Sequence, residues 1–196
     1  KDRFREVGLD PEEPPTTWDE LLEYALALTR DIDGDGRTDE WGLNFTTRAN
    51  MGSMYAFITF LWQAGGEIYS EDYSEAAFND ETAQETVQFW MDLAHKHKVL
   101  SLSPPTEGFE IGRIAMQYSS TSSIAATKDK VSFDLGVAAL PGNKNTVTGV
   151  GGSSLAIFRT TPEKEAAAWE FVNGAWPRAT SPSGFRCAPP RPTSNT

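Results

Sequence analysis

Two spacings of apolar residues recur along the chain, and each predicts a different kind of element. Apolar positions three and four residues apart predict helices, whereas short continuous apolar runs predict buried strands. Helical spacing predicts helices over residues 17–30, 54–64 and 80–94, and a further helix from Pro162 onward. Apolar runs predict strands over residues 41–45, 113–118, 133–140 and 146–158.

The first helix carries clear start signals and one apolar face. Thr17 and Glu20 have the spacing of a capping box, in which the Thr hydroxyl accepts a bond from the N–H three residues on and the Glu reaches back. Its apolar stripe comprises Trp18, Leu21, Leu22, Ala25 and Leu28. The helix over 80–94 has a comparable inward stripe, formed by Ala83, Val87, Trp90, Met91 and Ala94. Both helices are therefore expected to pack on a core.

A run of hydroxyl residues follows the predicted strand at 113–118. Ser119, Ser120, Thr121, Ser122 and Ser123 come in a row, and Ile124-Ala125-Ala126 then allow a helix to begin. A strand that ends in hydroxyls at the start of a helix offers O–H groups and free N–H donors together, which suits oxygen-rich ligands such as sugars or phosphates. The other interpretation is a solvated Ser/Thr turn whose hydroxyls only cap the helix.

Two further features are candidates for ligand contact. Glycines in the segment Gly149–Ser154 weaken a strand unless something must approach the backbone closely. Trp62 lies near the end of an apolar helix, beside Gly65-Gly66, where it could stack on a sugar ring. A place in the core is the alternative interpretation for Trp62.

The acidic turn after the first helix has the spacing of a calcium loop. Asp31, Asp33 and Asp35 take positions 1, 3 and 5 of an EF-hand-type loop, Gly36 takes position 6 and Asp39 takes position 9. The usual glutamate at position 12 is missing, so Glu40 or a distant carboxylate would have to complete the ligand set. The expectation is a structural calcium site without catalytic function, and the alternative is an acidic surface turn.

Composition narrows the classes of function. The 196 residues contain 17 Lys and Arg against 28 Asp and Glu, a net charge of −11, which opposes binding to nucleic acid. No apolar run reaches the length of a membrane span. A single cysteine, Cys187, excludes an internal disulfide and a cysteine-based metal cluster. The chain starts without Met and shows no signal peptide, so we expect a fragment of a longer protein.

Several short motifs occur in an order that resembles a known family. They are Pro-x-Thr-Trp-Asp-Glu-Leu (15–21), Leu-Trp-Gln-Ala-Gly-Gly (61–66), Gly-Arg-Ile-Ala-Met (112–116), Phe-Asp-Leu-Gly-Val-Ala-Ala-Leu-Pro (133–141), Gly-Gly (151–152) and Lys-Glu-Ala-Ala-Ala-Trp-Glu-Phe (164–171). Over residues 4–172 the chain looks like the family 1 extracellular solute-binding proteins of bacterial ABC importers, which carry sugars, oligosaccharides and glycerol-3-phosphate compounds.

The resemblance implies a periplasmic-binding-protein-like α/β fold of two lobes that close on a ligand. Residues 1–13 would connect from a first-lobe segment that this chain lacks, and 14–128 would form most of the second lobe. Residues 129–173 would return to an incomplete first lobe, and 174–196 would be an irregular tail unrelated to the family. The implied location is extracytoplasmic, with ABC permease subunits as membrane partners.

The resemblance also implies which residues meet the ligand. The run Ser119, Ser120, Thr121 and Ser122 stands where maltose-type members have a sugar-stacking tryptophan, and it is closer to glycerol-3-phosphate-type members. Gly151 and Gly152, with Ser153 beside them, match a glycine pair whose backbone approaches ligand from the other lobe. A small polyol, sugar or sugar-phosphate is therefore favoured over a long oligosaccharide.

Two other classes of function remain open at this point. A calcium-dependent interaction module would use the Asp31–Asp39 loop to bind a protein and would ignore sugars. A hydrolase fragment would need a nucleophile, and Gly152-Ser153-Ser154-Leu155-Ala156 only approaches the nucleophile-elbow pattern, since it ends in Ala and continues as a predicted strand. No catalytic cofactor is expected.

Overall fold

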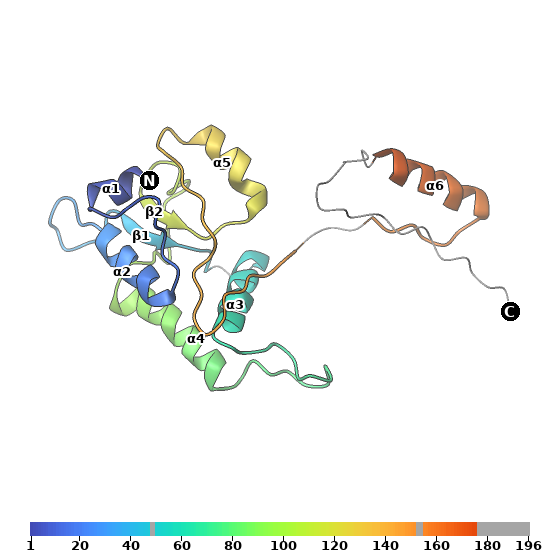
Figure 1. Cartoon of the computed structure of the whole chain (residues 1–196), viewed down its shortest axis with the longest axis horizontal. Coiled ribbons are helices and arrows are strands. Elements are labelled where there is room, and N and C mark those ends of the chain that lie inside the picture. The colour runs from blue at the N-terminus through green and yellow to red at the C-terminus, as the bar shows by residue number, and fades with distance from the viewer. Residues whose placement is uncertain (48–49, 152–154, 176–196) are drawn as a thin grey trace. The chain divides into compact units, whose positions relative to one another are not determined.

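The computed structural model describes residues 1–47, 50–151 and 155–175 (Figure 1). Its strands are β1 (Trp41–Asn44) and β2 (Ile114–Gln117), and its helices are α1 (Asp2–Glu6), α2 (Trp18–Leu28), α3 (Met51–Gln63), α4 (Glu81–Met91), α5 (Ile124–Lys130) and α6 (Pro162–Ala175). A π-helical turn, η1 (Asp92–Lys96), extends α4, and a 3-10 turn, η2 (Thr121–Ser123), precedes α5.

Contacts divide the chain into two compact units, one from Lys1 to Val150 and one that begins at Gly151. The first unit holds β1, β2 and the helices from α1 to α5, and the second unit holds α6. The predicted division into lobe segments at residue 128 stays a prediction, since a compact unit need not coincide with a lobe.

The helices begin where side chains can satisfy their first N–H groups. Thr17 caps α2 through a bond from the Glu20 N–H (3.1 Å). Glu20 reaches back one residue further than expected, because its carboxylate accepts bonds from the N–H and the hydroxyl of Thr16 (both 2.7 Å). Those bonds, the one from the Thr16 N–H first, lower the pKa of Glu20. The α3 helix begins at Met51, three residues earlier than predicted, because Asn50 and Ser53 form a capping box.

The core lies between α2, the sheet and α3. The two strands are parallel, with Trp41 opposite Ile114 and Leu43 opposite Met116, as the apolar runs at 41–45 and 113–118 predicted. Trp18 is central: its ring stacks on Phe89 (4.5 Å between centroids) and lies against Phe60 (5.2 Å). The buried apolar cluster comprises Trp18, Leu21, Ala25, Leu43, Phe45, Phe60, Ala64, Leu93, Val99 and Leu100.

The sheet and α2 approach each other as closely as two backbones can. A Cβ atom built at Gly42 would lie 2.6 Å from the carbonyl carbon of Ala25, which no real side chain tolerates. Glycine at this position of β1 therefore permits the packing of α2 on the sheet.

The inward face predicted for α4 is partly wrong. Val87 and Met91 are exposed (47% and 48%), whereas Thr86 and Leu93 are fully buried. Thr86 can be buried because its hydroxyl donates to the Thr82 carbonyl (2.9 Å), so that the polar group is satisfied within the helix. This shifts the buried face by one position relative to the apolar stripe.

The strands predicted over 133–140 and 146–158 do not form within the described residues. Apolar composition favours a strand there, yet within residues 133–140 the bond that the Asp134 carbonyl accepts from the Lys1 α-amino group (2.7 Å) is the one hydrogen bond between main-chain groups that the structure describes. A strand exists only where a neighbour supplies the ladder, and sequence composition cannot show whether a neighbour is present.

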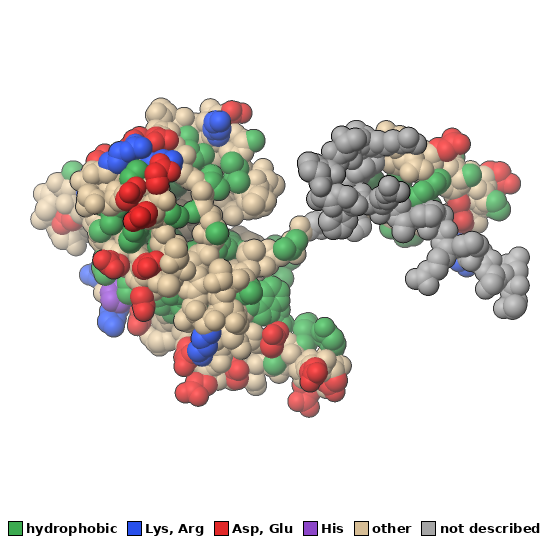
Figure 2. All heavy atoms as spheres, viewed as in Figure 1, with side chains coloured by type: hydrophobic (Ala, Val, Ile, Leu, Met, Phe, Trp, Pro, Cys, Tyr) green, Lys and Arg blue, Asp and Glu red, His purple; other side chains and the backbone are tan. Residues whose placement is uncertain are grey.

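Among the helices of the described part, none has the length and the apolar character that a bilayer crossing demands. Acidic side chains are spread over the face of the first unit seen in Figure 2, while basic ones gather at a few places.

Candidate functional site

The carboxyl ends of β1 and β2 meet at one edge of the sheet because the strands are parallel. The chain after β2 continues through Tyr118 into the hydroxyl run, and the chain after β1 continues into Phe45. In open α/β sheets, ligands bind in the crevice outside the carboxyl ends of the strands. This edge, between the sheet, α3 and α5 in Figure 1, is therefore the first place to look for a site.

A pair of hydroxyls, one on α3 and one on the residue that follows β2, lies at this edge. Thr59 is fully buried, and its hydroxyl lies 3.4 Å from the phenol oxygen of Tyr118. The same Thr59 hydroxyl accepts a bond from the N–H of Gly149 (3.2 Å). Thr59 thus ties three segments together that lie far apart in the sequence.

The C-terminal end of α3 fixes the segment around Gly149 in place. Gln63 is buried; its amide nitrogen donates to the Val147 carbonyl (3.0 Å), and its amide oxygen accepts from the Trp18 indole (2.8 Å). Two residues before Val147, the Asn145 side chain donates to the Trp62 carbonyl (3.0 Å). The site edge is therefore connected through Gln63 to the core.

A close backbone approach occurs at Gly149. A Cβ atom built there would lie 3.3 Å from the Thr59 hydroxyl and 3.6 Å from the Tyr55 ring. The glycine-rich pattern at 149–154 had predicted such an approach, and within the described residues α3 is the element that makes it.

The hydroxyl run is exposed over residues 119–122, half-buried at Ser123, and forms hydrogen bonds within itself. Ser119 and Ser123 hydroxyls lie 2.8 Å apart, and those of Ser120 and Ser122 lie 2.9 Å apart. Ser120 also caps η2, since its hydroxyl accepts a bond from the Ser122 N–H (3.3 Å). Capping and ligand contact are compatible, because a hydroxyl has one donor and two acceptor positions.

Asn44, the last residue of β1, holds a polar atom that the fold leaves unsatisfied. Its side-chain oxygen is buried and has no hydrogen-bond partner among the described residues, while its main-chain oxygen accepts a bond from the Tyr118 N–H (2.9 Å). Buried acceptors without a donor are rare, and a bound hydroxyl or water is a common explanation.

Sequence reasoning missed Asn44, Thr59, Gln63 and Tyr118. One signal was available: Thr59 and Gln63 are polar residues inside the otherwise apolar run at 54–64. A polar side chain in a buried helix must find a partner, so such residues indicate where other segments attach.

The remaining predicted ligand residues are described only in part. Trp62 is half-buried and lies on α3, with a ring carbon 3.9 Å from the Cβ position built at Gly149. Gly151 is exposed and begins the second unit. Gly152 and Ser153 lie outside the described residues. The contact of Trp62, Gly151, Gly152 and Ser153 with ligand remains a prediction.

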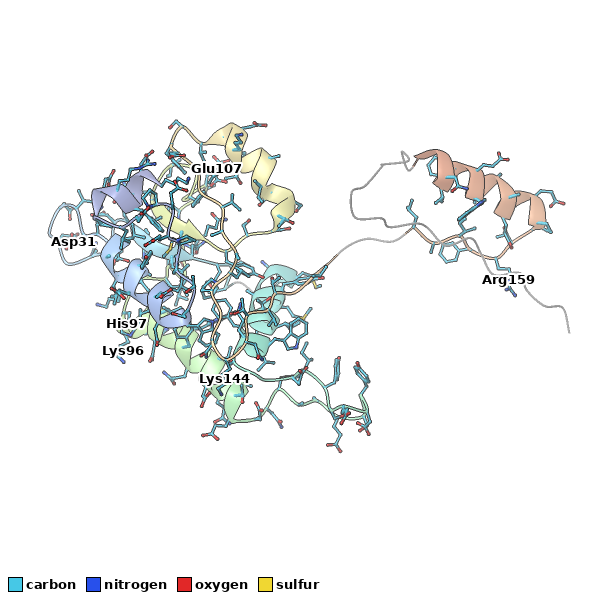
Figure 3. The ribbon with its side chains drawn as sticks, viewed as in Figure 1. Asp31, Lys96, His97, Glu107, Lys144 and Arg159 are labelled. Atoms are coloured by element: carbon cyan, nitrogen blue, oxygen red, sulfur yellow. The ribbon has the colours of Figure 1, made fainter. Side chains whose placement is uncertain are left out.

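The acidic loop brings three of the four predicted metal ligands together. One carboxylate oxygen from each of Asp31, Asp33 and Asp39 lies within 4.8 Å of the others, whereas Asp35 is outside this group. Calcium–oxygen distances of about 2.3–2.6 Å place opposed ligands roughly 5 Å apart, so the three oxygens fit a calcium ion. Asp31 marks the loop in Figure 3.

Backbone groups shape the loop, and Glu40 has another function. Asp31 accepts bonds from the N–H groups of Gly34 (2.8 Å) and Gly36 (2.9 Å), both of which have positive φ. Glu40, the suggested additional ligand, instead pairs with Arg30 (2.7 Å) and Arg3. The ligand set would therefore be completed by water or main-chain oxygens.

Replacing Asp33 by Ala should remove calcium-dependent stabilisation if the loop binds calcium. Binding to the folded state alone adds RT ln(1 + [L]/Kd), about 2.7 kcal/mol at a calcium concentration of 100 Kd. Thermal melts in calcium and in chelator measure the difference. Asp35→Ala should retain most of it, and Asp129→Ala, which removes an equal charge elsewhere, should retain all of it. Equal melting of the unmodified chain in calcium and in chelator would refute the calcium site.

Comparison with known proteins identifies the family. Residues 1–173 match the model of the family described as bacterial extracellular solute-binding protein. The sn-glycerol-3-phosphate-binding periplasmic protein UgpB of Pectobacterium atrosepticum is 26% identical over 206 residues, which cover 92% of this chain and 45% of that protein. UgpB of Escherichia coli K12 is 26% identical over 167 residues, with coverage of 81% and 37%.

Solved structures agree with this match. An ABC transporter solute-binding protein of Thermotoga lettingae, bound with alpha-D-tagatose, superposes with a TM-score of 0.72 at 29% identity, covering 87% of this chain and 44% of that one. The cyclic alpha-maltosyl-1,6-maltose binding protein of Arthrobacter globiformis gives 0.71 at 30% identity, with coverage of 88% and 44%. These neighbours have the two-lobe fold of periplasmic binding proteins, which confirms the predicted fold class.

The chain spans about half the length of these relatives. The family match nevertheless covers most of the chain, from the residue before α1 to within α6. The chain belongs to the family of bacterial extracellular solute-binding proteins.

Proposed function

We propose that the protein is the substrate-binding component of an ABC importer. It binds a sugar, polyol or sugar-phosphate-like solute at the carboxyl edge of the sheet and delivers it to permease subunits in the membrane. It acts outside the cytoplasm, as the periplasmic relatives do. It is not an enzyme, since members of its family are named for binding solutes.

The observation that carries the proposal is the concentration of uncharged hydrogen-bonding groups at this edge. The run Ser119–Ser123, exposed over 119–122, lies directly after Tyr118. The Tyr118 phenol meets the Thr59 hydroxyl, and the Tyr118 N–H donates to the Asn44 carbonyl. Hydroxyls and amides recognise neutral solutes rich in hydroxyl groups. The side-chain oxygen of Asn44 is buried without a donor, and a solute hydroxyl that reached it would satisfy it.

The names of the relatives support binding of a solute that carries hydroxyl groups, but they do not indicate which solute this chain binds. Their names and structures include alpha-D-tagatose, cyclic alpha-maltosyl-1,6-maltose and sn-glycerol-3-phosphate. A hydroxyl-bearing backbone is common to all three. Because the edge groups named above carry no charge, a sugar or polyol is the first choice for this chain and a glycerol phosphate is the second.

NMR spectra of the longest reading frame that contains this chain test the proposal. D-tagatose, maltose and glycerol-3-phosphate are titrated in turn, and the shifted amides are mapped. At least one solute should shift the amides of Asn44 and Tyr118–Ser123 more than those elsewhere. Shifts confined to other surfaces, or none with any solute at millimolar concentration, would overturn the assignment.

The acidic loop favours a second candidate, a calcium-dependent interaction module. The three clustered carboxylates of Asp31, Asp33 and Asp39 are the observation behind it. Such a module would bind a protein only in calcium and would ignore solutes in the NMR titration. A hydrolase fragment is tested by incubation with ester and glycoside substrates, since any turnover would contradict a binding function.

A further inference from the structure

The segment between α3 and α4, residues 66–80, projects from the body of the first unit (Figure 1). Two backbone bonds make it a short hairpin. The Ala77 N–H donates to the Ile68 carbonyl (2.9 Å) at the base. The Ser70 N–H donates to the Glu75 carbonyl (2.9 Å) nearer the tip. The hairpin shares no residue with the candidate solute site, so its function can be tested independently of the proposed one.

Asp72 organises the tip of the hairpin. One of its carboxylate oxygens, Oδ1, accepts bonds from the Ser70 hydroxyl (2.7 Å) and from the hydroxyl (2.7 Å) and the N–H (3.1 Å) of Ser74. These bonds, that of the Ser70 hydroxyl first, lower the pKa of Asp72 to about 2, so the carboxylate is ionised at neutral pH. All three bonds go to the same oxygen, which leaves Oδ2 as an acceptor for a partner.

Two tyrosine rings of the hairpin are exposed beside each other. Tyr73 is 81% exposed and Tyr69 is 55% exposed, and their ring centroids lie 6.3 Å apart at an interplanar angle of 48°. Tyr73 has a φ of 60°, in the left-handed region that bulky residues rarely adopt. Its N–H donates to the Ser70 carbonyl (2.9 Å), which helps to hold this conformation. Backbone strain of this kind clusters at functional sites, where the surrounding structure maintains it.

The hairpin is acidic and has no basic residue. Residues 66–80 include five Asp and Glu and no Lys or Arg. Figure 2 shows green hydrophobic side chains with red acidic ones beside them on this projection. Lys144, near Gly65 at the base, pairs with Glu85 of α4 (3.7 Å; Figure 3). Exposed rings among uncompensated carboxylates favour a cationic partner, because the face of a ring attracts a cation and the carboxylates pair with it.

We propose that this hairpin docks on a protein segment that presents an arginine. The guanidinium lies against the rings of Tyr69 and Tyr73 and donates to Oδ2 of Asp72. Arginine fits better than lysine, because its planar group stacks on aromatic faces and is less strongly hydrated than an ammonium. A protein segment fits better than a small cation, because small-molecule sites are concave and this hairpin projects from its unit. Tyrosine and arginine are also the residues enriched where protein interfaces bind most strongly.

NMR titration with two peptides tests the proposal in the longest reading frame that contains this chain. Acetyl-Arg-Gly-Arg-amide is the probe, and acetyl-Lys-Gly-Lys-amide carries the same charge. The arginine peptide should shift the amides of residues 67–78 more than amides elsewhere and bind at least about threefold more tightly than the lysine peptide. Equal affinity of the two peptides would overturn the proposal, because only unspecific attraction between charges would remain. Shifts confined to other surfaces, or none at millimolar peptide concentration, would overturn it as well.

Two variants assign the binding to particular groups of the hairpin. Tyr73→Asn removes the ring and suits the left-handed backbone, and Asp72→Asn removes the charge but keeps an oxygen that can accept the same bonds. Each should weaken binding of the arginine peptide about fivefold or more, and Tyr73→Asn should not lower the Tm. The controls Phe158→Ala and Asp129→Asn remove an exposed ring and an exposed charge elsewhere and should leave the affinity unchanged. Equal affinity of variants and controls would refute the assignment to this hairpin.

Tetramethylammonium distinguishes docking from a site for small cations. The arginine peptide should bind more tightly than this ion, because the peptide adds hydrogen bonds to the carboxylate. If tetramethylammonium shifts the same amides with equal or higher affinity, the hairpin binds small cations and the proposal is wrong.

Discussion

Trp18→Ala should lower the free energy of unfolding of the first unit by about 3–5 kcal/mol, the range for removing a large aromatic side chain from a core. The indole is 7% exposed and lies against both Phe60 and Phe89. Its N–H also satisfies the buried amide oxygen of Gln63 (2.8 Å), and an acceptor left without a donor adds about 1–3 kcal/mol. Urea denaturation followed by circular dichroism measures the change.

Trp18→Phe separates the two contributions. Phenylalanine keeps most of the stacking on Phe89 and loses only the bond to Gln63, so it should cost less than the alanine variant. Trp169→Ala is a matched control, because Trp169 lies on α6 in the second unit. A Trp18→Ala protein as stable as the unmodified chain would mean that this core does not hold the first unit together.

Periodicity predicted α2 well because its two signals agree. Thr17 supplies the cap, and Trp18, Leu21, Ala25 and Leu28 are the four residues that the structure buries. The strands β1 and β2 were predicted equally well, since short apolar runs are typical of buried parallel strands. Where the local pattern and tertiary packing favour the same residue types, the sequence alone is sufficient to predict the element.

The wrong predictions concern features that depend on contacts between residues far apart in the sequence or on hydrogen bonding by a side chain. Residues 133–140 have the composition of a strand but lack a neighbour among the described residues, and composition carries no information about neighbours. On α4, Thr86 replaces Val87 at the buried face because a hydroxyl can bond within its own helix. The pattern of hydropathy along the chain reveals neither effect.

The candidate site was predicted only in its exposed half. The hydroxyl run at 119–123 was visible because five hydroxyl residues in a row are rare and follow an apolar strand. Thr59 and Asn44, which both contact Tyr118 directly before the run, come from α3 and β1, and only the fold shows that these elements meet there. Whether Gly152 and Ser153 complete the site from the other side stays a prediction.

Removing the two middle hydroxyls, by Ser120→Ala with Thr121→Val, should weaken solute binding about tenfold or more. Each lost hydrogen bond in a desolvated site costs roughly 1–3 kcal/mol, and 1.4 kcal/mol is a factor of ten in affinity. Ser120 also caps η2, so part of the effect could come from the turn. Thr121→Val alone leaves that cap intact and isolates the loss of solute contact.

Titration calorimetry of this double variant tests the central claim most directly. It is made in the longest reading frame that contains the chain, with the solute that the NMR titration identifies. A matched control, Ser103→Ala with Thr106→Val, removes the same two groups from an exposed loop before β2. Our account predicts an unchanged dissociation constant for the control and one at least about tenfold larger for the Ser120/Thr121 variant. Equal affinity of the two variants would contradict it and would show that the hydroxyl run only caps a helix.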